Sequence, residues 1–409
     1  MLNFIWTALF LTAFLIAALK FWLLGEQAVF GTLLSAMFEA AKTAFDISLG
    51  LTGVLALWMG IMKIGEHSGF VTLLTKVLNP LFRRLLPEIP TDHPALGALT
   101  MNIAANMLGL DNAATPLGLK AMQAMQSLNP RPDTASDAQI VFLVLNTSSV
   151  TLFPVTIFAY RAQMGAHNPT DVFIPILIAT YASTMAGLLA VAWIQNIRLW
   201  DKVLLAYLGG ISLLLAGLIG YFAGLPREQM LQQSAALSQI LLFSLVVAFI
   251  AAAALRRLNA YELFVDGARD GFHTAVGIIP YLVAMLVAFA VFRASGALQI
   301  ATDGVAWLVT GLGMDSRFVD ALPTMLMKPF SGSGARAMML DAMQTHGADA
   351  FAGRLACIVQ GSTETTFYVL AVYFGSVNIK RIRHAAACGL IADAAGMITA
   401  ISTAYWFYG

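Results

Sequence analysis

Residues Met327–Met338 read Met-Lys-Pro-Phe-Ser-Gly-Ser-Gly-Ala-Arg-Ala-Met and interrupt an otherwise apolar part of the chain. Proline and glycine break a helix at this point, so residues 318–345 are predicted to form two short half-helices around a polar turn. Neither half is long enough to cross a bilayer. Non-helical backbone at membrane depth is tolerated only inside protein or beside a water-filled cavity. The segment therefore predicts a re-entrant helical hairpin.

A second interruption of the same kind lies at residues 95–126, where polar residues again break an apolar stretch. It also predicts two half-helices around a turn. Gly118–Met122 matches Gly334–Met338, and further on Asn146–Ser149 aligns with Gln360–Thr363. Because these matches keep the same order, they indicate an internal repeat.

The composition of the chain indicates a membrane protein, in which polar interruptions of apolar segments are unusual. Of 409 residues, 59% are apolar and only 11% are charged, whereas a soluble domain carries roughly 25% charged residues. This excludes a soluble enzyme, a coiled coil, a disordered chain and a nucleic-acid binder. The two cysteines stand apart in apolar sequence, and the six histidines show no paired spacing, so neither a disulfide framework nor a metal site is expected.

Apolar runs predict an all-α, polytopic integral membrane protein. The first run lacks a basic start and a cleavage site, so we expect a retained helix rather than a signal peptide. Amphipathic stretches at 27–45, 70–86, 258–272 and 297–313 are predicted to be interfacial helices. The predicted spans are 1–24, 47–64, 138–160, 171–195, 203–224, 236–255, 274–293, 351–375 and 385–407.

The repeat and the span count together predict the topology. The two predicted repeats are residues 1–196 and 231–409. A linker transmembrane helix within 197–230 joins them. Each half crosses four times, so the linker helix inverts the second half relative to the first. With the N-terminus inside, Lys20, Arg161, Arg227 and Arg293 lie outside and ten other basic residues lie inside, as the positive-inside rule requires. We therefore expect a multi-pass protein of the bacterial inner membrane. The ten inside residues are Arg83, Arg84, Arg198, Lys202, Arg256, Arg257, Arg269, Lys380, Arg381 and Arg383.

Polar residues inside these apolar segments are the candidate solute ligands, because a charge at bilayer depth is expensive unless it serves a purpose. Ser331–Arg336 offers backbone N–H groups suited to anions. Gln360–Thr366 interrupts the apolar span 351–375 with polar and small residues, and desolvation of Glu364 at this break suits a coupling proton or cation. The predicted substrate-binding residues are Asn106, Asp111, Asn112, Lys120, Asn146, Ser148, Ser331, Ser333, Arg336, Gln360, Ser362, Thr363 and Glu364.

Three structural alternatives remain open at this point. Asp111 and Lys120 can pair and lock the first hairpin, and the hydroxyl residues can form a helix–helix seam. Asp393 can pair with a neighbour. An intramembrane hydrolase built on Lys328 with Ser331 and Ser333 is a weaker interpretation, because the sequence shows no group to orient a base.

Three strings carry a resemblance to a known family: NIAANMLGLDNAATPLGLKAM (residues 102–122), MKPFSGSGARAM (residues 327–338) and QGSTETTFYVLAVY (residues 360–373). Here the chain resembles the spore maturation proteins A and B joined end to end, and the resemblance covers nearly its whole length. Each half is similar to a nucleoside-recognition or gate domain, a module shared with concentrative nucleoside transporters. The resemblance implies an elevator-type fold and a membrane role linked to spore maturation. The fused arrangement departs from the two separate proteins of the family.

The resulting hypothesis is a transporter-like membrane protein, not an enzyme, that moves a small polar or anionic solute through a midplane site between two opposed hairpins. H⁺ or Na⁺ is a candidate coupling ion, no cofactor is expected, and analogy favours a homodimer. The alternative is a non-transporting scaffold or regulator of envelope or spore maturation. The two hypotheses differ in geometry, because a transporter requires the hairpins to meet around a polar cavity.

Overall fold

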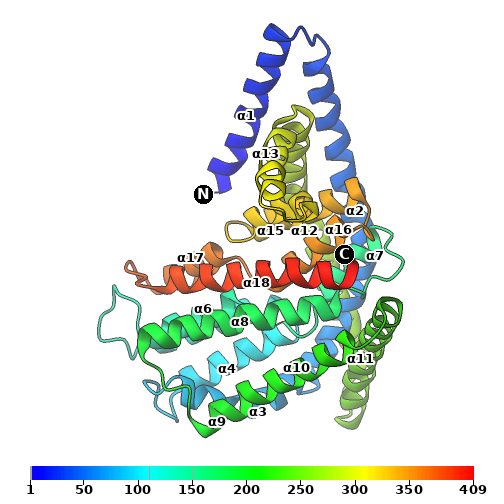
Figure 1. Cartoon of the computed structure of the whole chain (residues 1–409). Coiled ribbons are helices and arrows are strands. Elements are labelled where there is room, and N and C mark those ends of the chain that lie inside the picture. The colour runs from blue at the N-terminus through cyan, green and yellow to red at the C-terminus, as the bar shows by residue number, and fades with distance from the viewer. Residues whose placement is uncertain (1, 110, 150) are drawn as a thin grey trace.

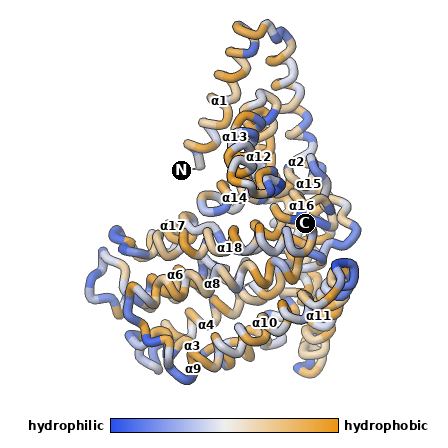
Figure 2. The backbone as a smooth tube through the Cα atoms, in the orientation of Figure 1, coloured by the Kyte–Doolittle hydropathy of each residue, from blue (hydrophilic) through white to orange (hydrophobic). Residues whose placement is uncertain are grey.

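The computed structural model describes residues 2–109, 111–149 and 151–409, with the side chains of residues 2 and 111–113 outside the description. The fold is built from helices, and apolar colour runs along most of them while polar colour gathers in the connections (Figure 2). Within the described residues, eight helical stretches are long and apolar enough to cross a membrane. They are Asn3–Leu23, Val29–His67, Phe173–Gln195, Lys202–Ala223, Arg227–Leu255, Ala260–Ala294, Phe351–Ser376 and Ala385–Tyr408.

The first half of the chain contains one long helix, a short amphipathic helix, a helical hairpin, a broken helix and a full-length helix. Its N-terminal helix α1 precedes this series. In chain order the elements are α1 (Leu2–Leu23), α2 (Val29–His67), α3 (Phe70–Leu85), α4 (Pro94–Met107), α5 (Asp111–Gln126), α6 (Asp137–Thr147), α7 (Val155–Gln163) and α8 (Phe173–Gln195).

The second half repeats this order of elements after two further apolar stretches. A π-helical segment, η1, interrupts the first of them. The elements are α9 (Lys202–Leu204), η1 (Leu205–Gly209), α10 (Gly210–Ala223), α11 (Arg227–Leu255), α12 (Ala260–Ala294), α13 (Ala297–Gly311), η2 (Arg317–Ala321), α14 (Leu322–Met327), α15 (Gly332–His346), α16 (Phe351–Ser362), α17 (Thr366–Ser376) and α18 (Ala385–Tyr408).

The long helices α2 and α12 differ from the sequence prediction. The stretches 27–45 and 258–272 are not separate interfacial helices, because each continues into the following apolar run as one helix of 39 or 35 residues. At about 1.5 Å per residue α2 is about 58 Å long, well beyond the ~30 Å hydrocarbon thickness. The charges at the beginning of each helix therefore lie on an extension of a spanning helix. The amphipathic helices predicted at 70–86 and 297–313 are present as α3 and α13.

Helices α2 and α12 pack closely along much of their length (Figure 1). Glycine makes this approach possible, since a Cβ at Gly271 would lie 2.6 Å from the Cα of Ala56. The Ser48 hydroxyl donates a 2.6 Å hydrogen bond to the carbonyl of Ala275 across the same contact. Small residues and interhelical hydrogen bonds are the usual means of helix association in lipid.

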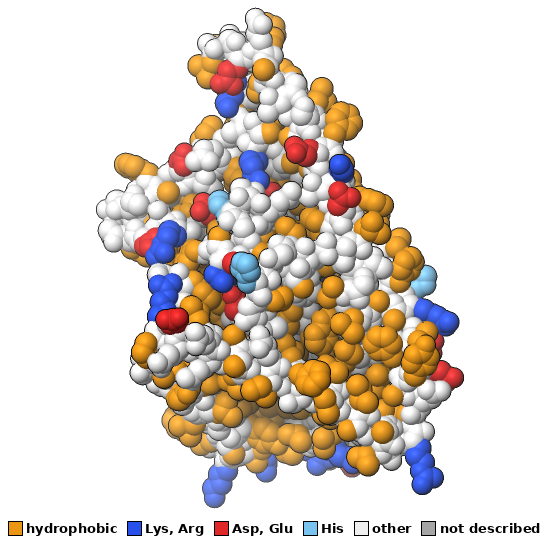
Figure 3. Space-filling view, turned by 90° about the vertical axis from the view of Figure 1, so that its right-hand side faces the viewer, with side chains coloured by type: hydrophobic (Ala, Val, Ile, Leu, Met, Phe, Trp, Pro, Cys, Tyr) orange, Lys and Arg blue, Asp and Glu red, His pale blue; other side chains and the backbone are white. Residues whose placement is uncertain are grey.

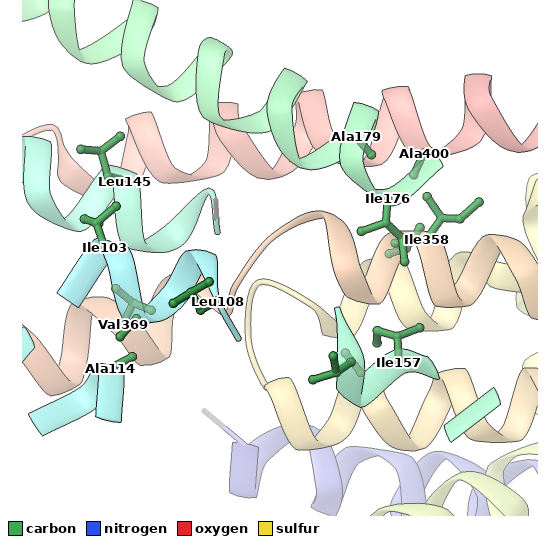
Figure 4. Packing of buried hydrophobic residues seen from close by; sticks show 14 of the residues in the cluster. Ile103, Leu108, Ala114, Leu145, Ile157, Ile176, Ala179, Ile358, Val369 and Ala400 are labelled. Atoms are coloured by element: carbon green, nitrogen blue, oxygen red, sulfur yellow. The ribbon is translucent and has the colours of Figure 1, made fainter. Parts of the chain in front are cut away.

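A second group of helices, α6, α8 and α18, lies side by side, and α2 and α12 run steeply across its edge (Figure 1). Small residues again allow two helices to pack closely: a Cβ at Gly187 of α8 would lie 3.0 Å from the Cβ of Ala392 on α18. Figure 4 shows Ala179 and Ala400 facing each other above the Ile176–Ile358 contact. This layer holds the hairpins and broken helices in place.

The face shown in Figure 3 carries a wide apolar area in its lower half, and charged residues lie above it, at its sides and along the lower rim. Because lipid tails are the solvent for such a surface, this distribution fits a protein that spans the bilayer. The chain is a multi-pass membrane protein.

Candidate functional site

Both hairpins and the breaks in two discontinuous helices meet at one pocket of about 80 Å³. The turn of the first hairpin contributes Gly109, and the second hairpin contributes Lys328, Gly332 and Arg336. The breaks in the two discontinuous helices complete the wall with Ser149, Thr151, Phe153, Pro154, Val155, Thr156, Ile157, Tyr160, Gln360, Gly361, Thr363 and Glu364. Segments more than 200 residues apart thus enclose a single space.

Backbone hydrogen bonds hold the four segments together. In the first half, the N–H of Leu152 donates to the carbonyl of Met107 at 2.9 Å. In the second half, the N–H of Phe367 donates to Pro329 at 3.0 Å, and the N–H of Glu364 crosses between the halves to Thr147 at 2.7 Å. Helix ends leave unpaired backbone groups, and here each break satisfies groups of its neighbour.

Two cationic side chains line the pocket. Lys328 is only 2% exposed, and its Nζ donates a 2.8 Å hydrogen bond to the carbonyl of Gln360 near the C-terminal end of α16. A positive charge is favourable there because the helix dipole is negative at that end. The guanidinium of Arg336 lies 5.5 Å from the ring centroid of Tyr160. Glu364 is the one anionic side chain among the described residues of the pocket.

Each break is also fastened to a full-length helix. The hydroxyl of Thr180 on α8 donates to the carbonyl of Ser148 at 3.3 Å, and it contacts the Ser149 carbonyl as well. Ser149 has a positive φ of 47°, which is unusual for a residue other than glycine. On the other break, Thr366 donates to Asp393 on α18 at 2.6 Å. The neighbour that the sequence interpretation allows for Asp393 is therefore Thr366.

The structure brings four of the predicted site residues directly to the pocket, namely Arg336, Gln360, Thr363 and Glu364. Glu364 is exposed, in contrast to the desolvated position that its apolar sequence context predicts. Among described residues no basic side chain lies within ion-pairing distance of it.

Six other predicted residues support the pocket through local hydrogen bonds. The Nδ2 of Asn106 donates to Asn146 at 2.9 Å, so an amide pair joins the first hairpin to the first broken helix. Ser331 accepts the N–H of Gly334 at 3.0 Å and caps α15. Ser148 and Ser362 donate to carbonyls three residues earlier, and Ser333 lies 3.3 Å from the Ser331 hydroxyl.

Of the three remaining predicted residues, Lys120 lies on an exposed face of α5 and does not line the pocket. The side chains of Asp111 and Asn112, and with them the predicted Asp111–Lys120 pair, lie outside the described residues.

Several pocket residues are absent from the predicted substrate-binding set. Ser149, Thr151 and Tyr160 lie in a stretch that hydropathy alone assigns to one continuous span. Pro154 was the available signal, since proline removes a helix hydrogen bond and directly precedes α7. Lys328 was considered only as part of a hydrolase.

A buried ion-pair network lies beyond Tyr160, at one end of the site. Arg161 is fully buried and pairs with Asp171 at 2.8 Å and with Asp349 at 3.0 Å. Arg354 pairs with Asp171 at 2.8 Å, and the hydroxyl of Tyr408 donates to the Asp171 carbonyl at 2.9 Å. The network joins the end of α7 to α16 and α18. No group of three His, Cys, Asp or Glu side chains suited to a metal ion occurs in the part of the chain that is described.

Comparison with known proteins places these segments in a family context. A family model described as "Gate: Nucleoside recognition" matches residues 48–164 and 275–380, which include all four pocket segments. Spore maturation protein A of Bacillus subtilis (strain 168) is 44% identical over 154 residues, 38% of this chain and 79% of that protein. Spore maturation protein B of the same organism is 43% identical over 155 residues, 38% of this chain and 85% of that protein.

Proposed function

Since the chain belongs to the nucleoside-recognition (Gate) family, we propose that it is an inner-membrane transporter-like protein that moves a small polar or anionic solute between its two hairpins. The observation that carries the proposal is the convergence of both hairpins and both broken helices on one polar pocket. Discontinuous helices that meet around a shared site are the usual construction of solute sites in secondary transporters.

The charges of the pocket favour an anionic or strongly polar solute. Among the described lining residues, Lys328 and Arg336 carry positive charge and Glu364 carries negative charge. Backbone N–H groups at the beginning of α15 add a partial positive charge on the same side. A solute with a phosphate, carboxylate or several hydroxyl groups would match these donors.

The volume of the pocket indicates a closed state. A cavity of about 80 Å³ is far below the ~300 Å³ of a typical site for a drug-sized ligand. A nucleoside-sized solute therefore needs a hairpin to move outward. The bonds Leu152–Met107 and Phe367–Pro329 tie each hairpin to the adjacent broken helix and are the contacts that such a movement breaks.

Ligand-dependent thermal stability of the purified protein tests the proposal. A panel of nucleosides, phosphorylated solutes and small carboxylates is screened for a rise in Tm. Binding at 100 times Kd stabilises a protein by about 2.7 kcal/mol, which is readily measured. We expect Arg336→Gln and Glu364→Gln to fold and to lose the response to the active solute. Lys120→Gln, outside the pocket, is the matched control and should keep it.

A scaffold or regulator of envelope or spore maturation is the second candidate. It is favoured by the polar groups that satisfy one another, such as Asn106 with Asn146 and Lys328 with the Gln360 carbonyl. Transport of the stabilising solute into proteoliposomes separates the two functions. A solute that binds but is not moved, or an unchanged response in Arg336→Gln, contradicts the transport proposal.

A further inference from the structure

Behind the pocket lies a buried carboxylate that the proposed solute site does not use. Asp393 of α18 is 2% exposed. Its Oδ2 accepts the Thr366 hydroxyl at 2.6 Å, whereas its Oδ1 has no hydrogen-bond partner among the described groups. A buried carboxylate oxygen without a partner is costly unless a proton or cation neutralises it.

Two buried hydroxyl groups near this position are also without partners in the described structure. That of Thr363 belongs to the break between α16 and α17, and that of Ser183 belongs to α8. Gly396, one helical turn after Asp393, lets these elements approach: a Cβ there would lie 2.8 Å from Cγ2 of Thr363 and 3.1 Å from Cβ of Ser183. The carboxylate of α18 and hydroxyl residues of two neighbouring elements thus lie close together.

Among the described residues, Lys328 and Glu364 are the charged groups that act on Asp393. Lys328 directs its described hydrogen bond to the Gln360 carbonyl, and α8 carries no charged residue.

The charged residues on the other elements packed against α18 have positions of their own: Arg354 pairs with Asp171, Asp137 pairs with Arg383, and Arg227 and Glu228 stand at the beginning of α11. Of the titratable residues, Tyr181 donates to the Leu208 carbonyl, Cys357 contacts Met343, Tyr368 is exposed and Tyr373 packs on Gly118.

We propose that Asp393, with the hydroxyl oxygens of Thr363 and Ser183, binds a small monovalent cation, H⁺ or Na⁺. Oxygen ligands suit a hard cation, and a protonated carboxyl instead donates its own hydrogen bond to a neighbouring hydroxyl. Thr363 lines the solute pocket as well, so a bound cation fixes the position of one residue in the pocket wall. This coupling rests on the proposed transport function, whereas cation binding itself does not.

Thermal unfolding of the full-length protein without solute tests cation binding. Tm is measured from pH 5 to pH 9 in NaCl or choline chloride of equal ionic strength. A sodium site raises Tm in NaCl at high pH. A proton site raises Tm as the pH falls, in both salts, because burial disfavours the charged carboxylate and the folded state takes up the proton more readily. Asp393→Asn should lose whichever response the wild type shows.

Two further variants keep the test decisive. Thr363→Val retains the carboxylate and removes one oxygen. It should therefore raise the apparent Kd for Na⁺ about tenfold, or shift the midpoint of the pH dependence of Tm, and it can be measured even if Asp393→Asn does not fold. Asp303→Asn, an exposed acid on α13, should leave both responses intact. The same pH and salt profile in wild type, Thr363→Val and Asp393→Asn overturns the cation site. A cation response without any stabilising solute overturns the transport proposal instead.

Discussion

At the scale of single residues, burial separates charged side chains with a structural role from the charged side chains of the proposed solute site. Arg161 was predicted to lie in an external loop, yet it is fully buried between two aspartates. Glu364 was predicted to be desolvated, yet it is exposed at the pocket. The difference arises because partners far along the chain, and not neighbours in sequence, decide the exposure of a side chain.

Arg161 provides the first prediction. Arg161→Met leaves the carboxylates of Asp171 and Asp349 without this partner, and removal of one member of a buried ion pair costs roughly 3–5 kcal/mol. We expect a clear fall in Tm in mild detergent. Arg269→Met is the control, because its pair with Asp266 is exposed on both sides and is worth at most about 1 kcal/mol. Equal Tm values for the two variants would contradict the structural role of the network.

At the scale of elements, the contact between α2 and α12 depends on glycine. Helix propensity alone favours replacing a helical glycine with alanine. At Gly271 a Cβ would instead meet the backbone of Ala56 at 2.6 Å, so the helices must move apart. A side chain at position 271 therefore stabilises the helix through its propensity but destabilises the protein through the packing that is lost.

The second prediction uses this contrast within one helix. Gly271→Val should lower Tm and the yield of folded protein, because both backbones of the helix pair are displaced. Gly277→Ala on the same helix should leave Tm unchanged or raise it slightly, since nothing lies within 4 Å of the added Cβ. Thermal unfolding of both variants checks the prediction, and a Gly271→Val protein as stable as the Gly277→Ala protein would refute it.

At the scale of the whole molecule, several basic residues that the prediction places on one side of the membrane lie near one another. Arg83, Arg84 and Arg198 line one pocket, Arg383 lines another, and the two pockets share Glu88 and Asp137. At another site Arg227 contacts the carbonyl of Gly409, while Arg161 lies in the network that includes Tyr408. The orientation itself stays a prediction.

The third prediction concerns topology. Single cysteines at Arg84 and Arg381 should react with a membrane-impermeant thiol reagent only from the cytoplasm, and one at Arg227 only from outside. All three positions are exposed, and the native Cys357 and Cys388 are fully buried, so background labelling should be low. Labelling of position 227 from the cytoplasm would rule out inverted repeats with an odd linker crossing.

The fourth prediction concerns assembly. An elevator-type movement needs a stationary partner, and the apolar faces of α1, α10 and α11 are mostly uncovered. We expect a homodimer, measured by native mass spectrometry in mild detergent. A monomer that still transports the stabilising solute would contradict it.

The amino-acid sequence by itself determined the class of the protein, its helical nature, both hairpins and the helix break at Gln360–Thr366. These properties are local, since hydropathy and helix-breaking residues act within a window of about 20 residues. The repeated order of elements could also be read from the sequence, because weak matches recur in the same order in both halves.

Only the tertiary structure decided which interruptions meet and which side chains they expose. It extended α2 and α12 into long continuous helices, placed Lys120 away from the pocket and brought Lys328, Tyr160 and Thr151 into it. It also placed Asp393 beside the break of another helix. The physical reason is that such contacts join residues separated by tens to hundreds of positions. The packing of small residues between helices selects which segments meet, and hydropathy along the chain contains no information on that packing.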